Sequence, residues 1–435
     1  MPIGVIEALD AEARGIAREN GKAIFIDDAL PGESVEYASY RKKSSYEQAH
    51  LVRVLHPAVA RVPPRCPHFG ICGGCVMQHL ECSAQVAVKQ RVLEDNLWHI
   101  GRVRPEELLP PIQGPAWGYR RKARLGVRRV HKKGGVLVGF HERRSSYIAD
   151  IRTCLVLHPA ASALILPLRE LIDRLSIRER LPQVEVAIGE RCLALALRIL
   201  ETPTAADESL LRAFADQHQA TLYLQPGGPD SVCRFHPLPG VELDYRLPEF
   251  ALRIPFQPAD FTQVNHDINR VLIRRALTLL DPRPGETVAD LFCGLGNFSL
   301  PIARKGARVI GIEGNASLIE RARVAAGRNG LAHRVRFAAA NLFAATPESL
   351  RALGAIDKYL IDPPREGALE VIKSLPAARE EGAPSRIVYV SCHPATLSRD
   401  AAILVHQKSY RFLSAGIVNM FPHTAHTESI AVFGH

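Results

Sequence analysis

The stretch VADLFCGLGNFSLP at residues 288–301 decides the fold class of this 435-residue chain. Its first five residues, 288–292, are mostly apolar and typical of a buried strand. The glycine-rich residues 293–297 are typical of a tight turn, and residues 298–305 begin a helix. Many nucleotide-binding folds use a strand, a glycine turn and a helix in this order. The stretch therefore predicts an α/β fold without identifying the ligand.

Three further strands are predicted downstream, and each ends in a polar or reactive residue. Strand 309–312 is followed by Glu313, strand 358–361 by Asp362, and strand 387–390 by Ser391 and Cys392. Helix and strand alternate from about residue 262, which predicts a parallel sheet with crossover helices. Because the carboxyl ends of parallel strands share one edge, we expect these residues to form one ligand site. Glu313 stands where an acid pairs with ribose hydroxyls.

The composition narrows the class of protein. Hydrophobic residues make up 47% and charged residues 23% of the chain, as in ordinary globular proteins, and the length predicts about three domains. No apolar run reaches the ~18 residues of a membrane helix, and residues 1–10 do not form a secretory signal. Nine cysteines, an odd number, argue against a secreted disulfide scaffold. We expect a cytoplasmic protein whose clustered cysteines serve a metal or catalysis.

Cys66, Cys72 and Cys75 form a C-x5-C-x2-C cluster with two glycines in its turn. Three thiolates this close need a cation, and both zinc and an iron–sulfur cluster accept four cysteines. Either Cys82 or Cys154 can supply the fourth ligand. The spacing differs from the C-x3-C-x2-C of radical S-adenosylmethionine enzymes, which favours a fully protein-ligated, structural cluster.

Residues 120–144 carry most of the chain's net charge of +10, with ten Lys and Arg against one acid. Ala123, Leu125 and Val127 alternate with basic residues, which predicts a half-buried strand, and residues 136–140 return as the second strand of a hairpin. A hairpin with one basic face favours a polyanion such as RNA, because binding releases counterions. The alternative is a solvated surface without a partner.

The region before residue 260 contains several predicted elements besides the hairpin. Short strands in residues 1–55 suggest a small barrel, starting with strands at Gly4–Leu9 and Gly15–Ala17. Residues 83–100 are predicted to be helical, with Val88, Val92 and Leu93 on one face.

The motifs around the predicted site resemble those of a known family. An NAD enzyme would share the glycine turn and Glu313, but not the DPPR sequence or a cysteine after a later strand. The arrangement resembles the S-adenosylmethionine-dependent methyltransferase fold and, more closely, the RNA uracil-C5 methyltransferases. The matching motifs are DLFCGLGNFSLP (290–301), DPPR (362–365), SCHPATLSRD (391–400), FPHTAHTESI (421–430) and FTQVN (261–265). Together they span the last 175 residues.

The resemblance extends to the rest of the chain. Residues 1–55 resemble a TRAM domain, an OB-like RNA-binding β-barrel. The three clustered cysteines match [4Fe–4S] ligands of the RumA (RlmD) branch, with Cys154 at the place of the fourth ligand. That branch modifies a uracil in 23S ribosomal RNA, whereas the tRNA branch lacks barrel and cluster and the RumB branch lacks the barrel. The resemblance implies three domains: barrel 1–55, a central α/β domain 56–260 with the cluster and basic hairpin, and a Rossmann-like methyltransferase domain 261–435.

The resemblance also implies roles for individual residues. Contacts to S-adenosylmethionine would come from Gln263, Phe292, Asn297, Glu313, Asn341 and Asp362. Cys392 would be the nucleophile and Glu428 the base. Without the resemblance, Phe292 would be read as core and Gln263 and Asn341 as surface residues, whereas Cys293 is interpreted as a packing thiol.

These roles define a covalent mechanism. A thiolate that adds to C6 of uracil makes C5 nucleophilic enough to take a methyl group, and a base then removes the C5 proton. The mechanism needs a cysteine of lowered pKa, which we expect for Cys392. The uracil must be flipped out or presented in a single-stranded loop. We expect a monomer with no obligate protein partner.

Three other functions compete with this one. A tRNA uracil-C5 methyltransferase is the nearest, and a non-catalytic RNA-binding iron–sulfur protein is a second. A DNA cytosine-C5 methyltransferase would place its nucleophile in a Pro-Cys motif where this chain has Asp362-Pro363-Pro364.

Overall fold

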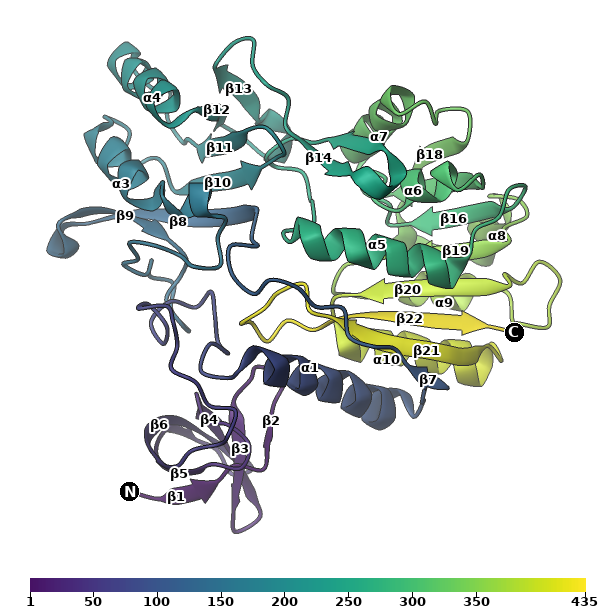
Figure 1. The fold of residues 1–435 in the computed structure, drawn as a ribbon, viewed down its shortest axis with the longest axis horizontal. Coiled ribbons are helices and arrows are strands. Elements are labelled where there is room, and N and C mark those ends of the chain that lie inside the picture. The colour runs from purple at the N-terminus through teal and green to yellow at the C-terminus, as the bar shows by residue number, and fades with distance from the viewer.

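The computed structural model describes all 435 residues, which form three main sheets with helices packed against two of them (Figure 1). The first sheet has the strand order β1-β5-β6-β4-β3-β2. Its strands are β1 (Ile3–Val5), β2 (Ala8–Leu9), β3 (Gly15–Glu19), β4 (Lys22–Asp27), β5 (Ser34–Lys42) and β6 (Tyr46–His56). The single strand expected over Gly4–Leu9 is divided in two, because its first part pairs with β5 and its last part with β3. The match to a TRAM barrel stays a prediction.

The second sheet has the strand order β13-β12-β11-β10-β8-β9. Its strands are β8 (Lys122–Val130), β9 (Gly135–Gly139), β10 (Gln183–Ile188), β11 (Leu193–Arg198), β12 (Ala220–Gln225) and β13 (Cys233–His236). The expected hairpin is confirmed, since β8 and β9 pair antiparallel and Ala123, Leu125 and Val127 are buried. Helices α3 (Ile165–Arg174) and α4 (Ala205–His218) contribute to the core of this sheet.

The third sheet has the strand order β18-β17-β16-β19-β20-β22-β21-β7. Its strands are β16 (Thr287–Leu291), β17 (Arg308–Glu313), β18 (Val335–Ala339), β19 (Lys358–Ile361), β20 (Arg386–Ser391), β21 (Arg411–Val418), β22 (Glu428–Gly434) and β7 (Glu107–Leu108). The expected parallel arrangement holds from β18 to β20. Strand β22 runs antiparallel to both β20 and β21, because residues 419–427 join β21 to β22 directly without a crossover helix.

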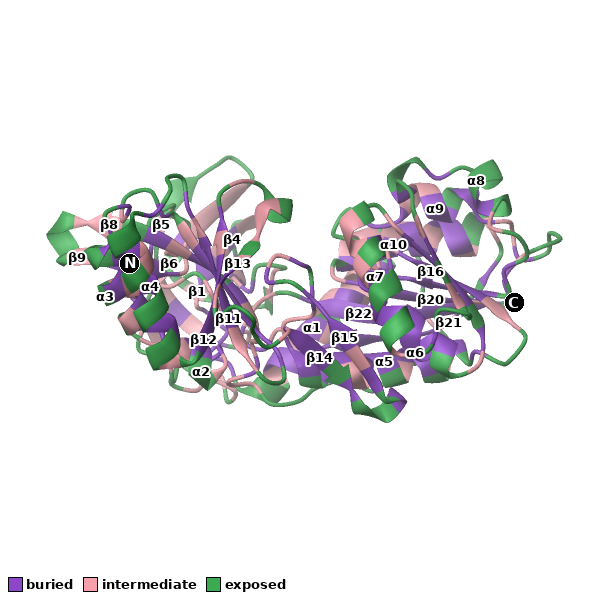
Figure 2. Cartoon of the chain, turned by 90° about the horizontal axis from the view of Figure 1, so that it is seen from above, coloured by how far each residue is buried: buried purple, intermediate pink, exposed green.

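Helices cover both faces of the third sheet, so its inner strands are buried on both sides, whereas the edge strands β18 and β7 are partly exposed. One face packs against α5 (His266–Leu280), α6 (Ser299–Arg304) and α7 (Ala316–Arg328). The other packs against α1 (Cys82–Asn96), α9 (Leu369–Ser374) and α10 (Pro394–Ala402). Figure 2 shows the resulting buried strands between helices that are exposed on their outer sides. No helix combines the length and apolarity that crossing a membrane requires.

Helix α1 is the element that differs most from its sequence prediction. It belongs to the region before residue 260, yet it lies beneath β21 and β22 of the third sheet (Figure 1). Its buried residues are Gln85, Val86, Lys89 and Leu93, whereas Val88 and Val92 are only half-buried, so the expected apolar face is right only at Leu93. The helix turns two polar side chains inward because they hydrogen-bond to residues 419–423. The domain boundary at 260/261 stays a prediction. Helix α1 and strand β7 precede this boundary in the chain, but both pack with the third sheet, whose other strands follow it.

Candidate active site

The carboxyl edge of the third sheet gathers the side chains that the sequence singled out. After β16 the chain turns through Gly294 and Gly296, whose φ angles of +54° and +87° favour glycine. Glu313, at the end of β17, accepts a hydrogen bond from the Gly294 N–H at 3.2 Å. Glu313 at the end of β17 therefore holds the glycine turn that follows β16.

One cavity of about 510 Å³ opens at this edge. It is lined by all eight residues expected to contact the methyl donor or catalyse, which are Gln263, Phe292, Asn297, Glu313, Asn341, Asp362, Cys392 and Glu428. These residues are spread over more than a third of the sequence, and the fold brings them to one place. Cys293 also lines the cavity, but burial raises its pKa well above the usual value for a thiol.

The side chain of Asn297 is occupied by protein contacts. Asn297 and Asn269 of helix α5 exchange two amide hydrogen bonds, at 2.9 and 3.0 Å. Each side chain thus satisfies a donor and an acceptor of the other. The pair ties the glycine turn to α5, so we expect Asn297 to shape the cavity rather than to bind a ligand through its amide.

Two aromatic rings lie side by side at the cavity wall, tilted by 58° to each other, and sequence reasoning identified only one of them. Phe292 has a φ of +63°, and its ring centroid lies 5.7 Å from that of Phe343. Phe343 is 49% exposed and lines the same cavity. The sequence signal was its position two residues after Asn341, beyond the end of β18. An exposed aromatic ring at this position can stack on a planar ligand.

Three acidic groups around the cavity influence one another. Burial and the neighbouring Asp290 raise the pKa of Asp362 to about 7. Burial and Asp362 raise the pKa of Glu428 to about 8. Burial, followed by Glu428 and Asp362, raises the pKa of Cys392 to about 11, although Arg365 acts in the opposite direction. The prediction of a lowered pKa for Cys392 is therefore wrong, because two carboxyl groups share its poorly solvated site.

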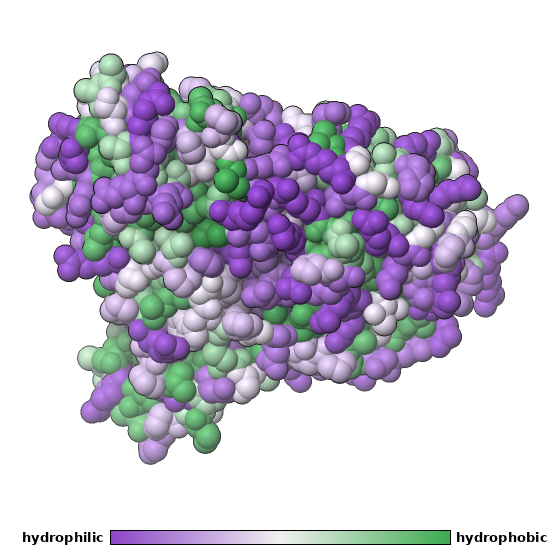
Figure 3. All heavy atoms as spheres, turned by 45° about the horizontal axis from the view of Figure 1, so that its top comes forward, coloured by the Kyte–Doolittle hydropathy of each residue, from purple (hydrophilic) through white to green (hydrophobic).

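A second cavity, of about 940 Å³, adjoins the first. The two share Arg365, Cys392, Phe421 and His426. The other walls of the second cavity come from the first sheet and from the region around the hairpin, and include Arg14, Asp27, Arg120, Arg143 and Arg144. Cys392 thus lies where a compact cavity meets a larger groove, whose lining contains arginines together with Glu12, Asp27 and Glu142. Hydrophilic side chains cover much of the molecular face drawn in Figure 3.

Comparisons with known proteins agree with this geometry. Residues 249–434 match the family model described as tRNA (Uracil-5-)-methyltransferase. A protein of Dechloromonas aromatica named 23S rRNA (uracil(1939)-C(5))-methyltransferase RlmD is 65% identical, with 100% of this chain and 99% of the relative covered. The protein of the same name from Cupriavidus pinatubonensis is 60% identical, with 99% and 95% covered. The chain belongs to the RNA uracil-C5 methyltransferase family.

A solved structure supports the same fold for this uracil-C5 methyltransferase. The Pyrococcus abyssi tRNA (uracil-54, C5)-methyltransferase, in complex with S-adenosyl-L-homocysteine, aligns with a TM-score of 0.74. The alignment covers 99% of this chain and 100% of that one at 24% identity. The expected α/β methyltransferase fold is confirmed at this level.

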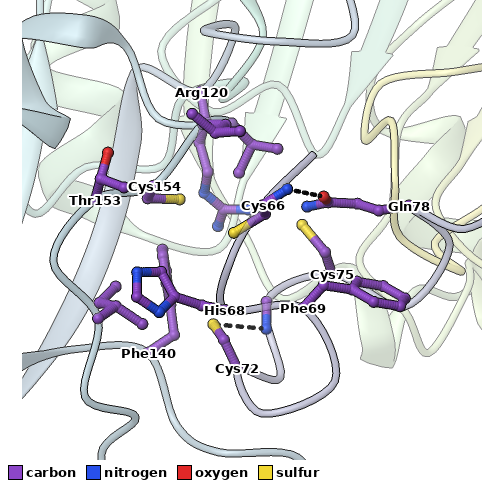
Figure 4. Close-up of a pocket in the computed structure, with 14 residues that line it drawn as sticks. Cys66, His68, Phe69, Cys72, Cys75, Gln78, Arg120, Phe140, Thr153 and Cys154 are labelled. Atoms are coloured by element: carbon purple, nitrogen blue, oxygen red, sulfur yellow. Dashed lines mark hydrogen bonds between the residues drawn. The ribbon is translucent and has the colours of Figure 1, made fainter. Parts of the chain in front are cut away.

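The clustered cysteines of the uracil-C5 methyltransferase surround a separate cavity of about 150 Å³ (Figure 4). Cys66, Cys72, Cys75 and Cys154 all line it, whereas Cys82 is exposed at the start of α1 and does not. No group of three or more His, Cys, Asp or Glu side chains is arranged to hold a single metal ion. The structure therefore favours Cys154 over Cys82 as the fourth member of the set, and the cluster itself stays a prediction.

The basic segment of the uracil-C5 methyltransferase is less free than its sequence indicated. Six of its ten cationic side chains have acidic partners: Lys122, Arg124, Arg129, Lys133, Arg143 and Arg144. Arg143 pairs with Asp28 at 2.7 Å and Arg144 with Asp27, so both link the segment to β4 of the first sheet and the turn after it. Arg124 and Arg128 remain exposed on β8. Ten cationic side chains and one acid give residues 120–144 a local charge of +9. This value overestimates the positive charge available to a polyanion, because acids from distant parts of the chain offset it.

Proposed function

We propose that this enzyme transfers a methyl group from S-adenosylmethionine to C5 of a uracil in 23S ribosomal RNA, through a covalent adduct with Cys392. The position of Cys392 at the junction of the two cavities is the observation that carries the proposal. A methyl donor in the smaller cavity and a uracil entering from the larger groove would meet at the Cys392 thiol. Relatives at 65% and 60% identity, named for uracil 1939, support that nucleotide as the target.

The donor site is proposed from the residues of the smaller cavity. Glu313 suits the ribose hydroxyls, and the neighbouring rings of Phe292 and Phe343 suit the adenine. Gln263, Asn297, Asn341 and Asp362 complete the wall of the cavity. The positive sulfonium of the donor would lie among carboxyl groups, where it offsets the charges that raise the pKa of Cys392.

The first chemical step is addition and methyl transfer. The Cys392 thiolate forms a bond to C6, and the electrons of the C5–C6 double bond move into the carbonyl to give an enolate. C5 then attacks the methyl carbon of the donor, whose carbon–sulfur bond breaks and leaves S-adenosylhomocysteine. After this step C5 carries both its hydrogen and the new methyl group.

The second step is elimination, for which Glu428 is the proposed base. Its carboxylate takes the C5 proton, the electrons of the broken C–H bond restore the C5–C6 double bond, and the thiolate leaves C6. Glu428 is only 5% exposed, and its Oε2 atom has no hydrogen-bond partner in the protein. A buried, unpartnered carboxylate oxygen on the cavity wall is free to accept a proton from a substrate.

The RNA is proposed to bind in the larger groove. A uracil can reach Cys392 only when it is flipped out of a stack or lies in a single-stranded loop. The first sheet and the segment at residues 140–144 both line the groove, and the pairs Arg143–Asp28 and Arg144–Asp27 join them into one wall. We propose that the first sheet is a TRAM barrel, and that the enzyme acts as a monomer in the cytoplasm.

The cysteine cavity is proposed to hold a [4Fe–4S] cluster. Four thiolates would bind separate corners of such a cluster, which fits four cysteines spaced around a cavity rather than converging on one ion. The group would serve as a structural link between the segment at residues 66–75 and the segment around Cys154. The same four thiolates also fit zinc by type, and iron analysis distinguishes the two metals.

One experiment tests the activity and the substrate together. The purified protein is incubated with methyl-labelled S-adenosylmethionine and separate 23S rRNA and tRNA pools from cells that lack the enzyme, and the methylated nucleotide is mapped. We expect 5-methyluridine in 23S rRNA alone. Label in tRNA alone would favour the tRNA alternative. Label in neither pool, with RNA still bound, would favour the non-catalytic one.

A further inference from the structure

Lys89 is a buried cation that the proposed mechanism does not use. It lies on α1, is 1% exposed, and is among the largest fully buried side chains of the chain. Its Nζ atom donates to the side-chain oxygen of Asn419 and to the backbone oxygen of Phe421, each at 2.8 Å. Burying a lysine is costly unless the charge has partners, so its place in the core calls for a role.

Both acceptors of Lys89 belong to the β21–β22 connection, residues 419–427, which ends at Glu428. Residues before position 266 form hydrogen bonds to successive residues of this connection. Asn265 donates to the oxygen of Met420 (3.3 Å), Tyr119 to that of Pro422 (3.0 Å), and the N–H groups of Val76 and Met77 to that of His423 (2.9 and 3.0 Å). The N–H of His423 donates to Gln85 (2.8 Å). Lys89 supplies the only two of these bonds whose donor is an amine, which is charged below its pKa of about 7.

The charge of Lys89 also acts on Glu428. The groups that interact electrostatically with Glu428 are Asp362 after β19, Cys392 after β20, and Lys89 from α1, and Arg365 and His426 line the same cavity. Asp362 raises the pKa of Glu428, while Lys89 lowers it. In return, Glu428 raises the pKa of Lys89, which burial alone would lower further than its value of about 7. Each of the two groups favours the charged form of the other.

We infer that Lys89 is a positioning residue for the elimination step, which holds the β21–β22 connection in place and favours the carboxylate of Glu428. The inference rests on the proposed function, because it assigns a partner to the proposed base. Lys89 does not line either of the cavities at Cys392. Its loss should therefore spare thiol addition and methyl transfer, and slow the removal of the C5 proton.

The test separates these steps in single turnovers with Lys89→Met. A 23S rRNA fragment with tritium at C5 of the target uracil reports proton removal, and methyl-labelled donor reports methyl transfer. At pH 7 we expect tritium release to fall about tenfold, while methyl transfer changes by less than about twofold. Raising the pH should restore tritium release, because the carboxyl group of Glu428 then ionises without the help of the cation. The rising limb of the profile should shift upward by on the order of one pH unit.

Three further variants make the test specific. Lys358→Met removes another buried lysine, which bonds to Glu286 and Asp281 at the opposite end of the third sheet, and should leave both rates unchanged. Lys89→Arg keeps the positive charge, so the rising limb of its pH profile for tritium release should stay at the wild-type position. Asn419→Asp, which is nearly isosteric, places a negative charge beside the ammonium and should shift the limb upward even if Lys89→Met fails to fold.

The outcomes distinguish the inference from the proposed function. An unshifted limb in Asn419→Asp, or a parallel fall of both rates in a folded Lys89→Met protein, would overturn the role of Lys89. If the wild type forms no denaturation-resistant complex with 5-fluorouracil RNA, the covalent mechanism itself fails, whatever the Lys89 variants do.

Discussion

The hydroxyl group of Tyr245 donates a hydrogen bond to the side-chain oxygen of Asn297 at 3.0 Å. Tyr245 lies on β14 (Asp244–Leu247), before the methyltransferase motifs, and its ring also lines the donor cavity. Together with Asn269, Tyr245 uses the oxygen of the Asn297 amide for structure. The glycine turn is thus held from two elements that the sequence motifs do not include.

Tyr245→Phe should weaken S-adenosylhomocysteine binding. One neutral hydrogen bond contributes about 1 kcal/mol, so we expect a roughly fivefold higher Kd by titration calorimetry. Asn297→Ala should weaken binding further, because it also removes the contacts to Asn269. If Tyr245→Phe binds normally while Asn297→Ala does not, the amide of Asn297 contacts the donor directly.

Cys392→Ala should abolish methylation and the covalent complex with 5-fluorouracil RNA, because no thiol can add to C6. The readout is a complex that survives denaturing gel electrophoresis. Cys293→Ala is the matched control, since Cys293 lines the same cavity, and it should retain the complex. Persistence of the complex in Cys392→Ala together with its loss in Cys293→Ala would make Cys293 the nucleophile.

Glu428→Gln should add to uracil and transfer the methyl group, but leave the methylated adduct unresolved. Natural RNA should then accumulate as a denaturation-resistant complex. In the wild type, resolution should become faster from about pH 7 to about pH 9, because a carboxyl group with a pKa of about 8 is neutral below that value and a base above it. Normal turnover by Glu428→Gln would assign the base to another group.

Cys154→Ser should lose iron, whereas Cys82→Ser should keep it. Only Cys154 lines the cavity with the other three cysteines, and Cys82 is exposed. Anaerobically purified wild type should be brown, absorb near ~400 nm and contain about four irons per chain. Zinc in place of iron would contradict the cluster, and iron retained only in Cys154→Ser would move the fourth ligand to Cys82.

Neutralising Arg124 and Arg128 together should weaken RNA binding and reduce its salt dependence by roughly one to two units of slope. Both side chains are exposed on β8, and donor affinity should not change. Neutralising Arg129 and Lys133, whose ion pairs of 3.1 and 3.4 Å are shorter than the 3.9 Å pair of Arg124 with Glu185, is the matched control and should have a smaller effect. Equal RNA affinity in the Arg124 and Arg128 double variant would make β8 a solvated surface without a role in binding.

Much of the fold follows from local patterns in the sequence. The alternation of Ala123, Leu125 and Val127 predicts strand β8 correctly, and the apolar run with its glycine turn predicts β16 and the start of α6. These patterns are reliable because strand periodicity and turn geometry depend on neighbouring residues. Helix α1 was predicted in place, but only Leu93 of its expected face is buried, because residues 419–423, more than 300 positions away, hydrogen-bond to Gln85 and Lys89 and hold these side chains inward.

The sequence by itself determined the α/β class, the family motifs and the eight residues that line one cavity. Tertiary structure alone decided the pKa values of those residues and the hydrogen bonds and ion pairs that position them. The pKa of Cys392 is raised rather than lowered because the thiol is buried and, to a smaller extent, because Glu428 and Asp362 act on it. Five basic side chains of the segment at residues 120–144 have acidic partners that other parts of the chain supply. Lys89 bonds to the connection that carries the proposed base. Burial and Coulomb interaction act between residues that are distant in the chain, so they become visible only when the fold brings the residues together.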